Sequence, residues 1–127
     1  MGGATSGQLV EYVRSFDTRS WSCLHIAEGG LKCSNATVQN NDIGPCGTDT
    51  FNHWADGISV ACASTNIRNN LINSPTDGGI VLFGSPGSLV ENNTVWVETV
   101  CLPRLSWLVL LPLIYMLISS TRFWEEL

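Results

Sequence analysis

Three Asn pairs recur along the sequence and constrain its fold more than any other feature. They are Asn40-Asn41, Asn69-Asn70 and Asn92-Asn93, and each is followed two positions later by Ile or Val. The intervals between successive pairs are 29 and 23 residues. A period in the low twenties, built from short apolar segments, indicates an architecture in which repeated units stack on one another.

Short apolar runs with a period of two lie between these pairs. Ile58 with Val60, and then Ile67, show the spacing, and Gly, Asn, Ser and Pro separate the runs. Three short strands with their turns use about 22 residues, which is one rung of a parallel β-helix, or solenoid. One rung cannot bury its own apolar face. We therefore predict an all-β chain of about three stacked rungs, within residues 20–99.

The Asn pairs have a physical role in such a stack. Residues at the same corner of successive rungs lie about 4.8 Å apart, so inward-facing amides can bond to each other and to the turn backbone as a ladder. Asn also tolerates the left-handed backbone conformation of a sharp corner. The alternative is that each pair is only a turn dipeptide.

Composition limits the partners. The chain has 127 residues, is 44% hydrophobic and 13% charged, and carries a net charge of −5 with six Lys and Arg. This balance argues against nucleic acid as a partner, and against electrostatic capture of an acidic polysaccharide.

Cysteine usage points to an oxidising, extracellular compartment. Cys23, Cys33, Cys46 and Cys62 form an even set of disulfide candidates with three possible connectivities, and Cys101 is the odd one. Asn35-Ala36-Thr37 and Asn92-Asn93-Thr94 are acceptor triplets, so Asn35 and Asn92 are glycosylation candidates, although a ladder would bury one Asn of the second triplet. No secretory signal opens the chain, and we expect its beginning to be missing rather than its thiols to be reduced.

Two flanking segments differ from the repeats. The lead-in, residues 1–19, has apolar residues from Leu9 to Phe16 that suit either a helix or a strand. The tail, residues 100–127, contains an apolar run at 105–118 with Pro112 inside it. This run is short for a membrane span, and three interpretations remain open: a marginal anchor, a buried helix that covers the end of the stack, or a mistranslated segment.

The repeats resemble a known family. Asp56-Gly57-Ile58 and Asp77-Gly78-Gly79-Ile80, each followed by an Asn-Asn corner, look like consecutive rungs of the right-handed parallel β-helix (pectin-lyase-like) superfamily, most of all its secreted fungal proteins. The resemblance covers roughly residues 20–99. It implies a right-handed single-stranded β-helix and a carbohydrate-active protein, and it does not specify the reaction.

Within that superfamily, the polygalacturonases carry acidic residues on adjacent rungs. The resemblance therefore makes Asp56 and Asp77, 21 residues apart, the candidate catalytic pair. Gly78 replaces the second Asp of the family's pair, and the family's Gly-His-Gly has no counterpart here. The structural alternative is that each Asp accepts turn amides. Calcium is a further alternative, held by those two residues with Asp42 and Asp49, but no ligand spacing is diagnostic.

Three residues are candidates for substrate binding. His53 and Trp54 lie on an inserted loop, 44–54, where Trp54 can stack on a sugar or serve packing, and Arg68 follows Asp56 by 12 residues. We predict an extracellular protein, an incomplete fragment, that acts on or binds polysaccharide as a hydrolase or lyase. The alternative is a non-catalytic structural or glycan-binding protein. No cofactor is expected apart from calcium, and a membrane partner only if 105–118 is genuine.

Overall fold

The computed structural model describes residues 4–19, 21–26, 32–97 and 121–122, and within these ranges the regular elements are strands, with no helix. They are β1 (Leu9–Glu11), β2 (Arg14–Ser15), β3 (Trp21–Ile26), β4 (Thr37–Gln39), β5 (Asp42–Ile43), β6 (Ala55–Val60), β7 (Asn66–Arg68), β8 (Leu71–Asn73), β9 (Ile80–Leu82), β10 (Leu89–Glu91), β11 (Thr94–Trp96) and β12 (Thr121–Arg122). The prediction of an all-β chain is confirmed for this part of the protein.

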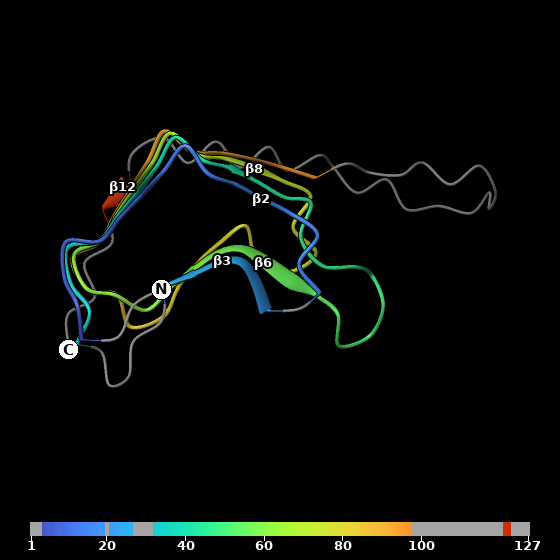
Figure 1. Ribbon diagram of the computed structural model, residues 1–127, viewed down its shortest axis with the longest axis horizontal. Coiled ribbons are helices and arrows are strands. Elements are labelled where there is room, and N and C mark those ends of the chain that lie inside the picture. The colour runs from blue at the N-terminus through green and yellow to red at the C-terminus, as the bar shows by residue number, and fades with distance from the viewer. Residues whose placement is uncertain (1–3, 20, 27–31, 98–120, 123–127) are drawn as a thin grey trace.

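The strands form three sheets, and the chain passes through them in a fixed order. The sheets run β1-β4-β7-β10-β12, β2-β5-β8-β11 and β3-β6-β9. All neighbours are parallel except β12, which is antiparallel to β10. We call β1–β3, β4–β6, β7–β9 and β10–β11 successive circuits, and Figure 1 shows them overlaid along the line of view. The lead-in, for which helix and strand were both open, contributes β1 and β2 to these sheets.

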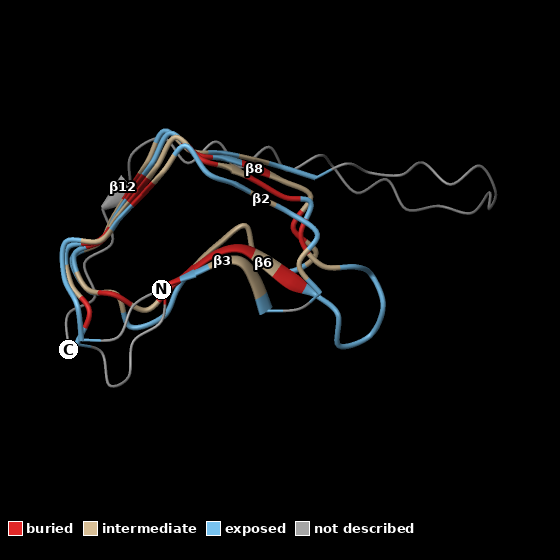
Figure 2. Ribbon diagram, viewed as in Figure 1, coloured by how far each residue is buried: buried red, intermediate tan, exposed pale blue. Residues whose placement is uncertain are grey.

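The core consists of the inward-facing residues of successive circuits, aligned by the strand register. Val10, Val38, Ile67 and Val90 are register partners in the first sheet, and all four are buried. Ile43 pairs with Ile72 in the second sheet, and Ile58 lies at 0% exposure in the third. Figure 2 shows buried segments in red within the sheets, β6 among them. Each fully buried Val or Ile contributes about 1.5–3 kcal/mol, which no single circuit obtains alone.

The predicted Asn ladder forms at the corner between the first two sheets. Asn41 Nδ2 donates to Asn70 Oδ1 at 2.9 Å, and Asn70 Nδ2 donates to Asn93 Oδ1 at 2.9 Å. Each amide also bonds a backbone carbonyl, that of Val10, Val38 or Ile67. Asn41 and Asn70 are each 2% exposed, so the ladder satisfies polar groups inside the core.

The first Asn of each pair has the other role proposed for it, that of a corner residue. Asn40, Asn69 and Asn92 have φ of 56°, 55° and 53°, the left-handed conformation that Asn adopts readily. Tyr12 takes this conformation in the first circuit, with φ of 55°. Val13 follows it and donates its backbone N–H to Asn41 Oδ1, so the ladder ends there. This first corner lacks an Asn pair, and the sequence pattern therefore did not reveal it.

Two disulfides join neighbouring circuits and settle the connectivity of the four candidates. Cys23 bonds to Cys46, and Cys33 bonds to Cys62, across 23 and 29 residues of sequence. The first bridge connects β3 of the first circuit to the second circuit, and the second connects the segment before β4 to the segment after β6. Cys101 lies outside the described residues.

The inserted loop projects from the second circuit and lengthens it. Gly47 and Trp54 form an antiparallel bridge, and the Thr48 N–H donates to the His53 carbonyl at 2.9 Å. Figure 1 shows this loop extending away from the sheets. It accounts for the interval of 29 rather than 23 residues between ladder positions, as predicted.

The apolar run at 105–118 lies outside the described residues, so its three interpretations stay open. In the described part of the chain, no helix has the length and apolar character needed to cross a membrane.

Candidate functional site

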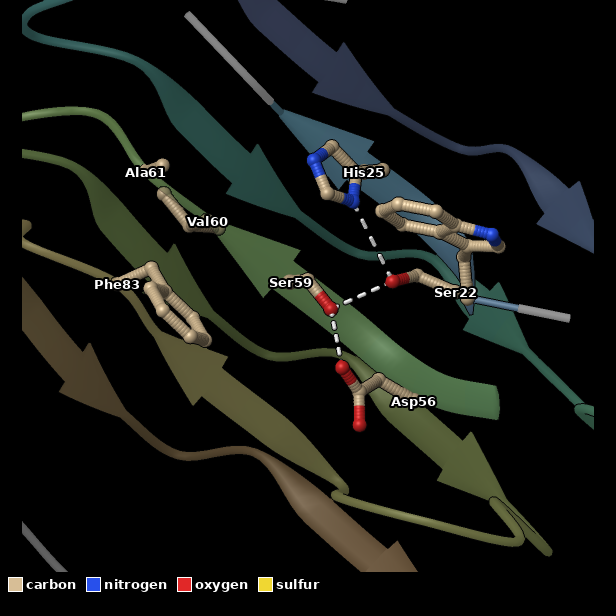
Figure 3. A pocket seen from close by; sticks show the side chains of 8 residues that line it. Ser22, His25, Asp56, Ser59, Val60, Ala61 and Phe83 are labelled. Atoms are coloured by element: carbon tan, nitrogen blue, oxygen red, sulfur yellow. Dashed lines mark hydrogen bonds between the residues drawn. The ribbon is translucent and has the colours of Figure 1, made fainter. Parts of the chain in front are cut away.

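The outer face of the β3-β6-β9 sheet carries a cavity of about 330 Å³. Eight residues line it, contributed by β3, by β6 with the residue after it, and by the residue after β9. They are Trp21, Ser22, His25, Asp56, Ser59, Val60, Ala61 and Phe83. Figure 3 shows the polar side chains among them gathered in one row.

A change in strand alternation brings two polar residues of β6 to this face. Gly57 and Ile58 both face the interior, so Asp56 and Ser59, three residues apart, both face outward. A Cβ on Gly57 would lie 2.5 Å from Ile72 Cγ2 and 2.6 Å from the Gly79 carbonyl oxygen. The close approach of β6 to its neighbours therefore requires glycine at position 57. The sequence Asp56-Gly57-Ile58-Ser59 thus brings the side chains of Asp56 and Ser59 to the outer face of the sheet.

Four polar side chains form a continuous hydrogen-bonded row across β3 and β6. Ser59 Oγ donates to Asp56 Oδ2 at 2.6 Å, and Ser59 Oγ lies 2.5 Å from Ser22 Oγ. Ser22 Oγ lies 3.5 Å from His25 Nδ1, a long contact. Register partners are Ser22 with Asp56 and His25 with Ser59, so the contact between the two serines crosses the strands diagonally. We call these four residues the polar row.

The carboxylate at one end sets the direction of the polar row. A carboxylate accepts hydrogen bonds, so the single proton of the Ser59 hydroxyl points to Asp56. Ser22 must then donate to Ser59, because Ser59 has no second proton. With its own proton committed, Ser22 has only lone pairs to offer at its long contact with His25 Nδ1. Both serine hydroxyls therefore point toward Asp56.

The carboxylate of Asp56 is held at both oxygens. The backbone N–H of Gly78 donates to Oδ1 at 2.8 Å, while Ser59 occupies Oδ2. This contact matches the structural role foreseen for an Asp in an Asp-Gly turn, but the amide comes from the next circuit rather than from the same turn.

Two exposed aromatic rings flank the polar row. Trp21 is 79% exposed and Phe83 is 71% exposed. The rings of Trp21 and His25 meet edge to face, with centroids 6.5 Å apart. The cavity therefore combines apolar ring surface with a line of hydrogen-bonding groups.

Asp77 does not join Asp56 in this cavity, which corrects the expectation of a stacked pair. The third sheet advances 22 residues per circuit at this point, since Ile58 is the register partner of Ile80. The residue beside Asp56 is therefore Gly78, whose N–H it binds. Asp77, at a spacing of 21, precedes that position and is exposed.

The predicted substrate-binding residues also lie elsewhere. His53 and Trp54 are exposed on the inserted loop, where the Trp54 ring meets Phe51 edge to face at 5.7 Å. Arg68 is on β7 in a different sheet, and its Nε donates to Gln39 Oε1 at 2.9 Å. None of the three lines the cavity.

The four acids considered for calcium are distributed over the molecule. Asp42 lies on β5 and pairs with Arg14 at 3.1 Å, and Asp49 is exposed on the inserted loop. The described residues contain no group of three or more His, Cys, Asp or Glu side chains that could hold a metal ion.

Both glycosylation candidates are exposed. Asn35 has φ of 57° at a turn, and Asn92 is the outward corner residue beside Asn93, the Asn of the pair that joins the ladder. The conflict between glycosylation and the ladder therefore does not arise, because different residues of the Asn92-Asn93 pair serve the two roles.

Comparisons of the chain with protein-family models, with curated proteins and with solved structures find no match. Of the eight residues that line the cavity, the sequence reasoning singled out only Asp56 and missed seven: Trp21, Ser22, His25, Ser59, Val60, Ala61 and Phe83. The one sequence signal for them was the alternation of side chains along the strand that contains Asp56-Gly57-Ile58. It indicates that Ser59 faces outward once it is known that Gly57 and Ile58 both face inward.

Proposed function

We propose that this chain is a segment of a right-handed parallel β-helix of the pectin-lyase-like type, which binds polysaccharide on the outer face of β3-β6-β9. Three features support the fold proposal: the fixed order in which the chain visits three parallel sheets, the Asn ladder, and the advance of 22 to 23 residues from β6 to β9 and from β7 to β10. Parallel crossovers of this kind are right-handed in nearly all proteins. The two disulfides support an extracellular location.

The observation that carries the binding function is the pairing of exposed rings with the polar row. Sugar rings present C–H faces that pack on aromatic surfaces, and hydroxyls that need hydrogen-bond partners. Trp21 and Phe83 offer the first kind of contact, and Asp56, Ser59 and Ser22 offer the second. An extended sheet face also suits a linear polymer better than a small enclosed ligand.

Binding is favoured over hydrolysis by the number of carboxylates. Glycoside hydrolysis ordinarily uses two carboxyl groups, about 5–5.5 Å or about 6.5–9.5 Å apart. Asp56 is the single carboxylate among the described residues that line the cavity, and Asp77 lies outside the lining. A hydrolase or lyase reaction in this groove would need a second acid or base that the described lining does not supply.

Truncation of the two rings tests this proposal. We expect Trp21→Ala and Phe83→Ala each to weaken binding about tenfold, because each removes an aromatic platform worth about 1–1.5 kcal/mol. Affinity electrophoresis of the full chain through gels that contain xylan, β-glucan, galactomannan or polygalacturonate measures the dissociation constants.

Phe51→Ala is the matched control. Its ring is 73% exposed but lies on the inserted loop, outside the cavity. Equal loss of binding in all three variants, or no retardation of the native chain by any of the polysaccharides, would refute binding at this face.

A further inference from the structure

We propose that the cavity on β3-β6-β9 accepts an uncharged sugar chain and excludes uronates, although the family resemblance points to pectin. This inference rests on the proposed function and specifies its ligand. It follows from two properties of the polar row, its charge and its hydrogen-bonding direction.

The charge of the cavity is unsuited to an acidic sugar. Proteins recognise carboxylates with Arg or Lys, and no Arg or Lys is among the described residues that line this cavity. Arg14 is paired with Asp42, and Arg68 bonds Gln39 on another sheet. A uronate in this cavity would face the Asp56 carboxylate with no Arg or Lys among the described lining residues to separate them.

The Asp56 carboxylate is not positioned to turn away from such a ligand. Its Oδ1 is bound by the backbone N–H of Gly78 at 2.8 Å, and its Oδ2 by the Ser59 hydroxyl at 2.6 Å. Ser59 is held in β6 by its register with β3, and Gly78 is held by its own carbonyl, which accepts from the Gly57 N–H at 2.8 Å. The carboxylate group is therefore held in place facing the cavity.

The direction of the row leads to the same selectivity. The protons of Ser59 and Ser22 are both used within the row, so these hydroxyls present lone pairs to a ligand. A sugar hydroxyl can donate to a lone pair, whereas an ionised carboxylate has no proton to donate. The row is thus complementary to sugar hydroxyls, and its serine hydroxyls offer no proton to the carboxylate group that distinguishes a uronate.

A comparison of binding to neutral and to acidic polymers provides the test. Gels with β-glucan, xylan or galactomannan should retard the full chain, and gels with polygalacturonate should do so at least about fivefold more weakly, the ratio that two like charges about 4 Å apart produce in water. Asp56→Asn should raise the affinity for polygalacturonate about fivefold, because it removes the opposing charge and keeps an amide oxygen for the Gly78 N–H.

Asp77→Asn is the matched control, since it changes the net charge equally at an exposed position outside the cavity. An equal gain for both variants would show that net charge, not the groove, disfavours polygalacturonate, and would overturn the inference.

The salt dependence of the native chain is a second measurement that needs no variant. We expect polygalacturonate binding to strengthen from about 20 to 200 mM salt, as screening weakens repulsion. A decrease would reveal attraction and overturn the inference.

The outcomes separate this inference from the proposed function. Preference for polygalacturonate over the neutral polymers, with loss of binding in Trp21→Ala, would reject the inference and retain the glycan-binding face. Failure of all the polymers to bind would reject both.

Discussion

Asn70 shows how much one side chain contributes to this fold. Its Oδ1 accepts from the backbone N–H and the side-chain amide of Asn41, and its Nδ2 donates to Asn93 Oδ1 and the Val38 carbonyl. The residue is 2% exposed, so water does not replace these partners easily. A single amide therefore connects three consecutive circuits inside the core.

We expect Asn70→Ala to lower the free energy of unfolding by about 3 kcal/mol or more. The substitution strands several buried donors and acceptors, and each unsatisfied group costs about 1–3 kcal/mol. Chemical denaturation followed by circular dichroism measures the loss. Asn69→Gly is the control, because Asn69 is exposed with φ of 55°, which glycine adopts freely, and its effect should stay below about 0.5 kcal/mol. A loss of less than about 1 kcal/mol for Asn70→Ala would contradict the structural importance of the ladder.

At this scale the sequence was informative for the ladder and incomplete for the site. The Asn pairs repeat, so their stacking could be predicted from spacing alone. Asp56 was recognised for the same reason, but its neighbours were not, because Ser22 and Ser59 meet only through a register offset of 34 residues. Asp77 was misplaced by one residue. It lies in the bend before β9, and the position that faces Asp56 is occupied by Gly78.

At the scale of elements, the strands are short and depend on their connections. Most have two or three residues, and each obtains its hydrogen bonds from the circuits beside it. The disulfide Cys23–Cys46 fixes the first circuit to the second, and Cys33–Cys62 joins the connections before β4 and after β6. Their pairing could not be predicted, since three connectivities satisfied the sequence equally.

Removal of either disulfide should destabilise the protein by about 2–4 kcal/mol. Closed loops with sequence separations of 23 and 29 restrict the unfolded chain by similar amounts, so Cys23→Ser with Cys46→Ser and Cys33→Ser with Cys62→Ser should have comparable effects. Thermal unfolding of each double variant, with and without reductant, measures this. If reductant left the midpoint of the native protein unchanged while the variants were destabilised, loss of packing rather than of the cross-link would be responsible.

The lead-in shows why element type was ambiguous there. Leu9, Tyr12, Val13 and Phe16 satisfy a helical period, and Val10 with Tyr12 satisfies a strand period. The structure selects strands because β1 and β2 find parallel partners in β4 and β5. This strand pairing depends on contacts between distant parts of the chain, and local propensity does not include such contacts.

For the whole molecule, the stacking order predicts a gradient of local stability. Strands β4 to β8 are paired on both sides, whereas β1, β2 and β3 each have one partner strand among the residues that the structure describes. In stacked architectures each unit is stabilised by its neighbours, so units with fewer neighbours open more often.

Hydrogen–deuterium exchange of the full chain measures this gradient. We expect the amides of β4, β6 and β7 to exchange most slowly, and those of β1 and β3 at least about tenfold faster, which corresponds to a difference of about 1.4 kcal/mol in opening free energy. Uniform protection across all strands would instead indicate that the circuits unfold as one cooperative unit.

The inserted loop has an evolutionary consequence. The ladder joins Asn41 to Asn70 across 29 residues and Asn70 to Asn93 across 23, with the same geometry at both steps. The difference is absorbed by a segment that leaves the sheets and returns at the Gly47–Trp54 bridge. Insertions and deletions there do not shift the register of any later strand, so this corner can change in length while the circuits around it are inherited unaltered. Lineages that carry this fold should therefore diverge first in the length and composition of this loop, and last in the amides that connect the circuits.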